Sequence, residues 1–256
     1  VEGQLPGGDP VGVQGLGAGH QLVAGSLSPT RHLLALTVIG LLVTAVVGRT
    51  LLRYDAPVPH TEERSGATPR RLDARTRRLV LVFGLIALCT AYGEGAMADW
   101  GALHLRQDLG ASAGLAAAGY TCFALAMTVG RASGTRLLER LGRSRTVIFG
   151  GSTAAAGMLL GSLAPWVWAT LLGFAITGLG LANLFPVAVE RAGALAGPSG
   201  VATASTLGYG GMLLGPPAIG FLADWTSLPT ALTSVAVLAA VATLIGVATR
   251  MGTTAG

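Results

Sequence analysis

Two carboxylates, Glu94 and Asp99, stand at the far end of a long apolar run. The run starts at Leu79 and carries no charged residue before Glu94. An ionised carboxylate at bilayer depth costs about 2.5–3.5 kcal/mol on insertion scales, so such a residue usually faces an interior cavity. We therefore expect Glu94 to bind a proton or contact a solute inside a cavity. The alternative is a helix-end carboxylate wetted by the outer aqueous layer.

Asp99 follows Glu94 after five positions, a rotation of about 140° at about 3.6 residues per helical turn. The two carboxylates therefore do not share a helix face, and paired acid–base chemistry between them is not predicted. Asp99 is expected nearer the membrane surface. Trp100, next to it, is expected either to contact a solute or to lie in the aromatic belt at the outer interface.

The elements that position these residues are apolar stretches of near-spanning length. Such stretches predict transmembrane helices, and they cover residues 33–52, 79–98, 113–131, 146–163, 166–189, 201–222 and 229–249. The chain is 51% hydrophobic and only 11% charged, whereas soluble domains are about a quarter charged. The expected fold class is an all-α membrane protein with about seven transmembrane helices.

The order of these stretches predicts four regions. Residues 1–31 are expected to form an irregular Gly-rich tail, and residues 32–53 a single transmembrane helix. An Arg-rich cytoplasmic linker is expected over residues 54–78, followed by six helices over residues 79–256. This order consists of one span, a long basic loop and six further spans. It is the order expected of a chain that has been cut near its middle.

Arginine placement predicts the orientation. The 17 basic residues are all arginines, and the pI is about 10. If residues 54–78 are cytoplasmic and seven spans alternate, only Arg31 and Arg106 fall on the outer side. The positive-inside rule therefore predicts a multi-pass protein of the cytoplasmic (plasma) membrane with a cytoplasmic C-terminus. It also explains the basic pI better than nucleic-acid binding does.

Three further polar residues lie inside predicted spans. Tyr120 and Tyr209 stand mid-span, and Asn183 is expected towards the inner end of its span. Phenols and amides in an apolar environment need hydrogen-bond partners. Each is therefore expected either to stabilise helix packing or to contact a solute.

The stretch GRASGTRLLERLGRSR, residues 130–145, predicts a short charged loop on the cytoplasmic side. Gly130 and Gly134 form a G-x-x-x-G step, which permits close helix packing. The other residues of the pattern place charge and a glycine in a tight turn at the membrane surface. They are Arg131, Glu139, Arg140, Gly142 and Arg143.

This loop resembles the signature cytoplasmic loop of the major facilitator superfamily, in its second copy between helices eight and nine. The common form there is G-x-x-x-D-R-x-G-R-[RK]; here Glu139 replaces the aspartate, and one more residue separates it from Gly134. The segment EGAMADW at 94–100 is similar to helix seven of a fucose-permease-like bacterial branch. NLFPV at 183–187 and G-x-x-x-G-P-P at 211–217 are similar to elements of its helices ten and eleven.

The resemblance covers roughly residues 28–250 and implies a facilitator-type bundle of helices six to twelve, without helices one to five. It implies a secondary transporter that moves a small solute by alternating access, with protons acting on Glu94. Residues 130–145 would form the cytoplasmic gate. The residues expected at the substrate or coupling site are Glu94, Asp99, Trp100, Tyr120, Asn183 and Tyr209.

The expected partners are a small solute, protons, membrane lipid, and either a separately encoded N-terminal half or a second copy. The alternative is a truncated or split membrane protein that does not transport. No enzyme is expected, because no H-E-x-x-H, G-x-S-x-G or P-loop pattern occurs. No cofactor or metal is expected either, and Cys89 and Cys122 are interpreted as small apolar side chains.

Overall fold

The computed structural model describes Leu34, residues 37–42, 44–46, Arg49 and residues 72–253. The chain divides into two units, Val1–Arg70 and Arg71–Gly256. In the first unit the described residues are helical, and most of them belong to a short apolar helix, Thr37–Val46. The predicted tail, the ends of the predicted first span and most of the predicted linker lie outside the described residues.

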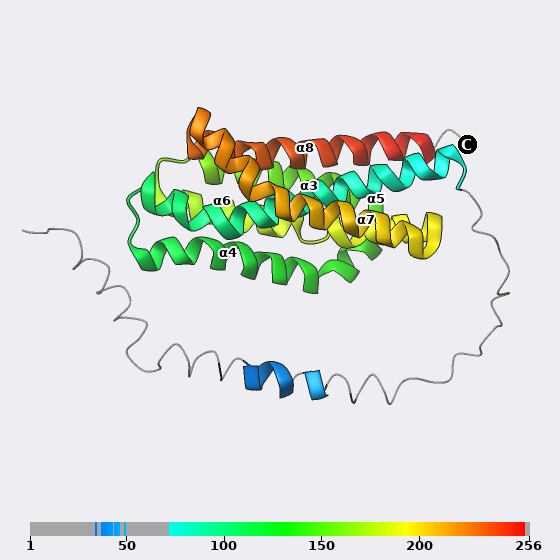
Figure 1. Ribbon diagram of the computed structural model, residues 1–256, viewed down its shortest axis with the longest axis horizontal. Coiled ribbons are helices and arrows are strands. Elements are labelled where there is room, and N and C mark those ends of the chain that lie inside the picture. The colour runs from blue at the N-terminus through cyan, green and yellow to red at the C-terminus, as the bar shows by residue number, and fades with distance from the viewer. Residues whose placement is uncertain (1–33, 35–36, 43, 47–48, 50–71, 254–256) are drawn as a thin grey trace, which may run out of the picture. The chain divides into compact units, whose positions relative to one another are not determined.

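The second unit consists of six helices (Figure 1). They are α3 (Ala74–Gln107), α4 (Ala113–Ala132), α5 (Gly134–Leu163), α6 (Val167–Leu181), α7 (Leu184–Trp225) and α8 (Leu228–Thr253). The part of the chain that the structure describes contains no strand. Five helical stretches are long and apolar enough to cross a membrane, and the longest, Val167–Trp225, has 59 residues.

This longest stretch crosses the bundle twice. At about 1.5 Å per residue it far exceeds a hydrocarbon core of about 30 Å. Gly197 interrupts α7 with φ 60° and ψ −143°, a conformation that side chains disfavour. Gly200 packs against the carbonyl of Ala192, on the other side of the break. Residues 184–196 and 198–225 of α7 are therefore two antiparallel segments, and Figure 1 shows α7 turning back on itself.

A second turn lies inside α5, at Gly142, with φ 74° and ψ 165°. Residues 134–141 continue the path of α4, because Leu137 N donates to Ser133 O and Ser133 N to Val129 O. The Ser133 hydroxyl also donates to the carbonyls of Val129 and Gly130, both at 3.0 Å. Such back-bonding bends a helix without ending it.

The predicted loop over residues 130–145 was therefore too long. Gly130 and Arg131 lie in α4, and Gly134, Glu139 and Arg140 lie in the first part of α5. The charged residues suggested a loop, but the backbone hydrogen bonds continue through them. Only the turn at Gly142 reverses the chain.

Helix α3 is longer than the predicted span 79–98. It begins at Ala74 because Asp73 caps it, accepting a hydrogen bond from Thr76 N at 3.3 Å. Hydrogen bonds from the side chain and backbone of Thr76 hold the pKa of Asp73 below its ordinary value. At the other end the helix continues to Gln107, and its last turns bury His104 and Leu105.

Helix α3 runs beside the second segment of α7, with very close backbone contact. A Cβ added to Gly95 would lie 2.5 Å from Met212 O, and one added to Gly215 would lie 2.9 Å from Tyr92 O. Small residues permit such approach between membrane helices. The two segments are parallel, since Gly84 contacts Leu207 and, further along α3, Trp100 contacts Gly220.

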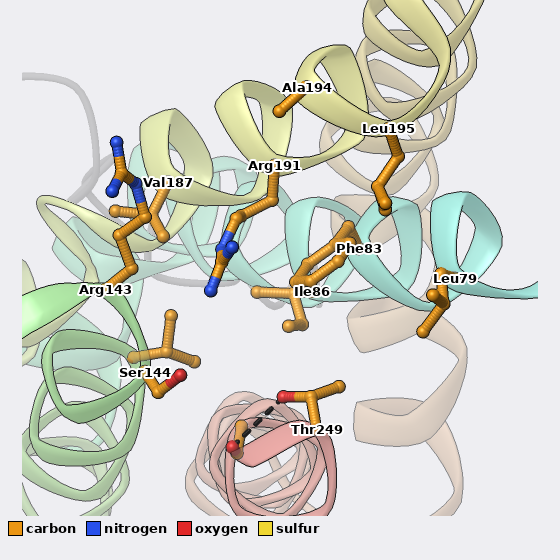
Figure 2. A pocket seen from close by; sticks show the side chains of 12 residues that line it. Leu79, Phe83, Ile86, Arg143, Ser144, Val187, Arg191, Ala194, Leu195 and Thr249 are labelled. Carbon is orange, nitrogen blue, oxygen red and sulfur yellow. Dashed lines mark hydrogen bonds between the residues drawn. The ribbon is translucent and has the colours of Figure 1, made fainter. Parts of the chain in front are cut away.

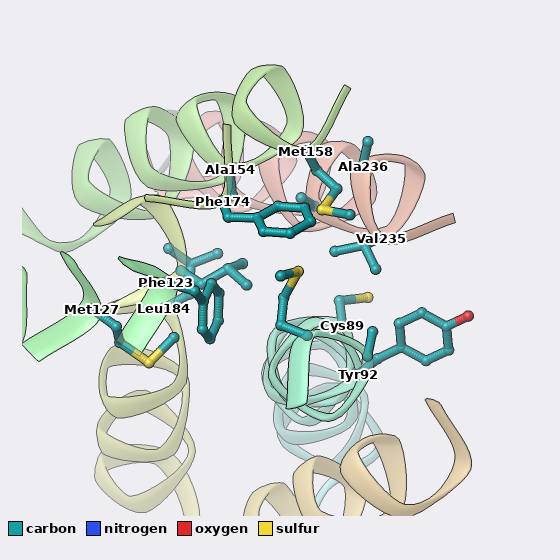
Figure 3. Packing of buried hydrophobic residues seen from close by; sticks show 14 of the residues in the cluster. Cys89, Tyr92, Phe123, Met127, Ala154, Met158, Phe174, Leu184, Val235 and Ala236 are labelled. Atoms are coloured by element: carbon teal, nitrogen blue, oxygen red, sulfur yellow. The ribbon is translucent and has the colours of Figure 1, made fainter. Parts of the chain in front are cut away.

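The centre of the bundle is a single apolar cluster (Figure 3). Phe123 of α4, Phe174 of α6 and Met158 of α5 are almost completely buried there. Helix α8 joins this cluster through Val235, and Tyr92 OH lies 2.9 Å from Ser234 Oγ. These contacts hold α3 and α4 at a fixed separation, which positions the side chains between them.

Candidate functional site

An ion pair joins α3 to α4. Arg131 Nη2 lies 2.9 Å from Glu94 Oε1, and Arg131 Nε donates to Ala182 O at 3.3 Å. One guanidinium thus links α3, α4 and the end of α6. The side chain of Glu94 is 22% exposed and that of Arg131 47%. The carboxylate is mostly enclosed, whereas the guanidinium keeps free surface for another ligand.

The pair lies midway along the bundle. Gly95, next to Glu94, contacts Met212, which is central in the α7 segment 198–225. Ala182, the partner of Arg131, is central in the pass that runs from Val167 to residue 196. The predicted position of Arg131 in a cytoplasmic loop was therefore wrong, because this residue lies within a helical pass. Helical contact between α3 and α4 brings both residues to the same depth.

A break between α6 and α7 creates the acceptor for Arg131. Ala182 and Asn183 separate the two helices. In a continuous helix, Ala182 O would accept from the N–H four residues later, but that residue is Pro186, which has none. Among the described residues, Ala182 O accepts a hydrogen bond from the Arg131 guanidinium alone.

Asn183 stabilises this break. Its Nδ2 donates to Gly130 O at 2.9 Å, and its side chain also packs against Gly134. The amide is buried and lies mid-pass, not towards the inner end as predicted. It does not line the cavity beside Glu94. Asn183 therefore positions the backbone next to Arg131.

The ion pair borders a cavity of about 160 Å³. Its other lining residues are aromatic, aliphatic, thioether and hydroxyl side chains: Tyr120, Phe123, Ala124, Met127, Thr128 and Met212. The Tyr120 ring stacks on Phe123 with centroids 6.1 Å apart. Charged and apolar groups thus meet in one space, which suits a small solute with an ionised group and an apolar part.

Asp99 and Trp100 lie outside this cavity, along an open groove between α3 and α7. Trp100 Nε1 donates to Pro216 O at 3.0 Å, and its ring rests on Gly220. Trp100 thereby fastens α3 to α7. Asp99 is exposed, and no described residue forms a hydrogen bond or ion pair with it.

Tyr209 is also separate from the ion pair. It is exposed, and its ring centroid lies 6.2 Å from that of Phe185. Of the six residues predicted at the substrate or coupling site, the structure brings Glu94 and Tyr120 to one cavity. Arg131, which the sequence assigned to the gate loop, completes it.

A second ion pair lies at the end of the bundle where the Gly142 turn is located. Arg143 Nε donates to both carboxylate oxygens of Glu190, at 2.9 and 3.0 Å, and Arg143 Nη2 also contacts Oε1. The pair connects α5 to α7. Sequence reasoning missed Glu190, although an acidic residue in an arginine-rich end region was a usable signal. Glu139 and Arg140 are exposed nearby.

His104 is a buried polar residue in the last turns of α3. Its Nδ1 lies 2.8 Å from Asp108 Oδ2, and its Nε2 lies 3.2 Å from Gly161 O. The ring thus connects α3 to α5 at the end of the bundle opposite Gly142. No group of three His, Cys, Asp or Glu that could hold a metal occurs among the described residues. Cys89 and Cys122 are free thiols.

Comparisons with known proteins agree with this architecture. The profile of the Major Facilitator Superfamily matches residues 83–254, more than half of the chain. An uncharacterised MFS-type transporter of Yersinia pestis is 32% identical over 230 residues, covering 89% of this chain and 58% of that relative. Membrane protein MosC of Rhizobium meliloti is 34% identical over 165 residues, covering 63% of this chain and 40% of MosC. The chain spans about half the length of these relatives.

A solved structure shows the same fold. It is the crystal structure of a mutant of the peptide transporter POT in complex with alafosfalin. The match covers 72% of the present chain and 40% of the POT chain, with a TM-score of 0.60 and 20% sequence identity. At this identity the likeness concerns the fold, and it confirms the predicted all-α, facilitator-type bundle. The resemblance inferred from the loop at 130–145 is likewise confirmed: the chain belongs to the major facilitator superfamily.

Proposed function

We propose that this chain forms the C-terminal part of a secondary transporter that moves a small solute across the cytoplasmic membrane by alternating access. The observation that carries the proposal is the Glu94–Arg131 ion pair, which lies midway along the bundle and borders a cavity. Solute and coupling-ion sites of such transporters lie near the bilayer midplane. Two relatives whose names describe a transporter and a membrane protein add support.

Glu94 is the proposed proton-binding residue. Its carboxylate is mostly enclosed, and among the described residues its partner is Arg131. Protonation of Glu94 would remove the negative charge that compensates the guanidinium. Arg131 would then favour an anionic group of the solute, so the proton and the solute would bind together. Tyr120 and Met212 supply the apolar contacts of this cavity.

Alternating access requires a contact that opens at one end of the bundle. The Arg143–Glu190 pair, together with the exposed Glu139 and Arg140, is the proposed cytoplasmic gate. The six passes over residues 79–256 would form two three-helix repeats that rock against a partner half. That half is separately encoded, supplied by a second copy, or part of a longer chain. The C-terminus is proposed to be cytoplasmic.

A second candidate is a split or truncated membrane protein that does not transport alone. It is favoured by one observation: the chain spans 58% and 40% of two transporter-like relatives. Among the described residues, several exposed apolar side chains lie beside the cavity, including Tyr120 and Met212. A partner half would cover them.

The test uses proteoliposomes loaded with a pH-sensitive dye and a panel of small carboxylate, amine and neutral solutes. A transported solute should drive proton entry, and Glu94→Gln should abolish that entry because it cannot ionise. Asp224→Asn is the matched control, since Asp224 is exposed, lies outside the cavity and the proposed gate, and forms no hydrogen bond with a described residue. Solute-driven proton entry that persists in Glu94→Gln would refute the coupling role. Uptake that appears only after a partner half is added would identify the split protein.

A further inference from the structure

A pocket of about 180 Å³ lies at the Gly142 end of the bundle, apart from the Glu94 cavity (Figure 2). We call it the end pocket. It is enclosed by α3, α5, α7 and α8, and most of its lining is apolar. The residues on which its chemistry depends are Phe83, Ile86, Arg143, Val187, Arg191 and Leu195.

Arg191 gives this apolar pocket a positive charge. Its side chain is half-buried, and Figure 2 shows it directed towards the space between Ile86 and Ser144. No described residue accepts a hydrogen bond from its guanidinium. The Glu190 carboxylate is already bound by Arg143. A half-buried guanidinium with free N–H donors is suited to bind an oxyanion, because its five N–H groups match the oxygens of phosphate and carboxylate.

The surroundings of the end pocket are strongly basic. Arg143 is the first residue after the Gly142 turn, and Leu195 lies two residues before the Gly197 turn, so the pocket is near the end of the bundle. Further exposed arginines belong to the same end: Arg75, Arg77, Arg78, Arg136, Arg140 and Arg145. A bundle that crosses a membrane places this end at the level of lipid headgroups.

Charge and apolar surface occur in the order that a phospholipid requires. Arg191 lies nearer the end of the bundle than Val187, which is fully buried, and Leu79 lies nearer the end than Ile86. A headgroup phosphate at Arg191 would leave the glycerol and the first acyl carbons against Phe83 and Ile86. A soluble anion would use the guanidinium and leave these apolar walls uncovered.

We propose that the end pocket binds an anionic phospholipid of the membrane, with its phosphate at Arg191 and an acyl chain against Phe83 and Ile86. Basic pockets between transmembrane helices are suited to such headgroups. The bound lipid would connect α3 to α5, α7 and α8 beside the Arg143–Glu190 pair. The inference requires only that the bundle lies in a membrane, and it does not depend on transport.

The test measures lipid binding to the purified protein in neutral detergent, by native mass spectrometry and by thermal unfolding. The probes are phosphatidylglycerol, phosphatidylcholine, glycerol phosphate and inorganic phosphate. Phosphatidylglycerol should bind the wild type and raise its unfolding temperature. Arg191→Gln should weaken this binding about five-fold, the typical contribution of one basic residue near an anionic surface. Arg191→Lys should retain most of it.

Two further variants separate a pocket from a diffuse basic surface. Arg145→Gln is the matched control, because it removes one exposed charge at the same end without touching the pocket. Leu195→Trp fills the pocket and leaves the net charge unchanged, so it should also weaken phosphatidylglycerol binding. Equal losses in Arg145→Gln and Arg191→Gln would overturn the proposal. So would binding of glycerol phosphate or inorganic phosphate as tight as that of the lipid, since this would identify a soluble anion.

Discussion

Pro186 stands four residues after Ala182 and lacks the N–H that would bond to the Ala182 carbonyl in a continuous helix. The Ala182 oxygen instead accepts a hydrogen bond from Arg131 Nε at 3.3 Å. The helix break between α6 and α7 thus positions the charge of Arg131, which belongs to α4. The same guanidinium binds Glu94 at 2.9 Å. The geometry of the candidate site therefore depends on a residue that does not line its cavity.

Replacing Pro186 with Ala should restore the missing N–H and let the helix continue through the break. Ala182 O would then be occupied, and Arg131 would lose one of its anchors. A hydrogen bond to a charged group contributes about 1.5–3 kcal/mol, so we expect about ten-fold weaker solute binding without loss of thermal stability. Titration of a transported solute measures this. Pro198→Ala, beyond the Gly197 turn, is the control and should leave binding unchanged.

The Glu94–Arg131 pair should show energetic coupling in a double-mutant cycle. Because both side chains are partly exposed, we expect a coupling free energy of about 1 kcal/mol, the upper range for solvent-accessible pairs. The measurement is the free energy of reversible unfolding in mixed micelles, determined for the wild type, Glu94→Gln, Arg131→Gln and the double variant. Additive single effects would show that the pair contributes nothing to stability.

Gly95→Ala should destabilise the bundle. The added Cβ would lie 2.5 Å from Met212 O, so α3 and the second segment of α7 must separate, at a cost of about 1–3 kcal/mol. Gly114→Ala is the matched control, because nothing lies within 4 Å of its added Cβ. That control should be neutral or slightly stabilising, as alanine favours a helix over glycine. Equal unfolding midpoints for the two variants would contradict the packing described here.

The cap at Asp73 should make the start of α3 sensitive to acid. Its pKa is lowered in the folded protein, so its stabilising effect is present above the ordinary pKa of 3.8 and is lost as the pH falls through the lower, folded value. Asp73→Asn should keep the cap and remove this pH dependence. Thermal midpoints between about pH 2 and 6 test it. An unchanged pH profile in Asp73→Asn would rule out the cap as the cause.

Hydropathy alone determined the fold class, because crossing a bilayer depends on the composition of each segment. The apolar stretches near 79–98 and 229–249 each correspond to a helix of the structure. The charged loop carried the family resemblance, which the comparisons confirm. The sequence also identified Glu94, since a carboxylate after fifteen residues without charge is costly unless it has a partner.

Only the tertiary structure decided what that partner is. Arg131 is 37 residues from Glu94, and Arg143 is 47 residues from Glu190, so neither pair leaves a local pattern. Charge density suggested a loop around Arg131, but backbone hydrogen bonds keep it helical, and contact with Ala182 places it midway along the bundle. Local composition determined which segments are helices. The depth, partner and exposure of each polar side chain depend on how those helices pack.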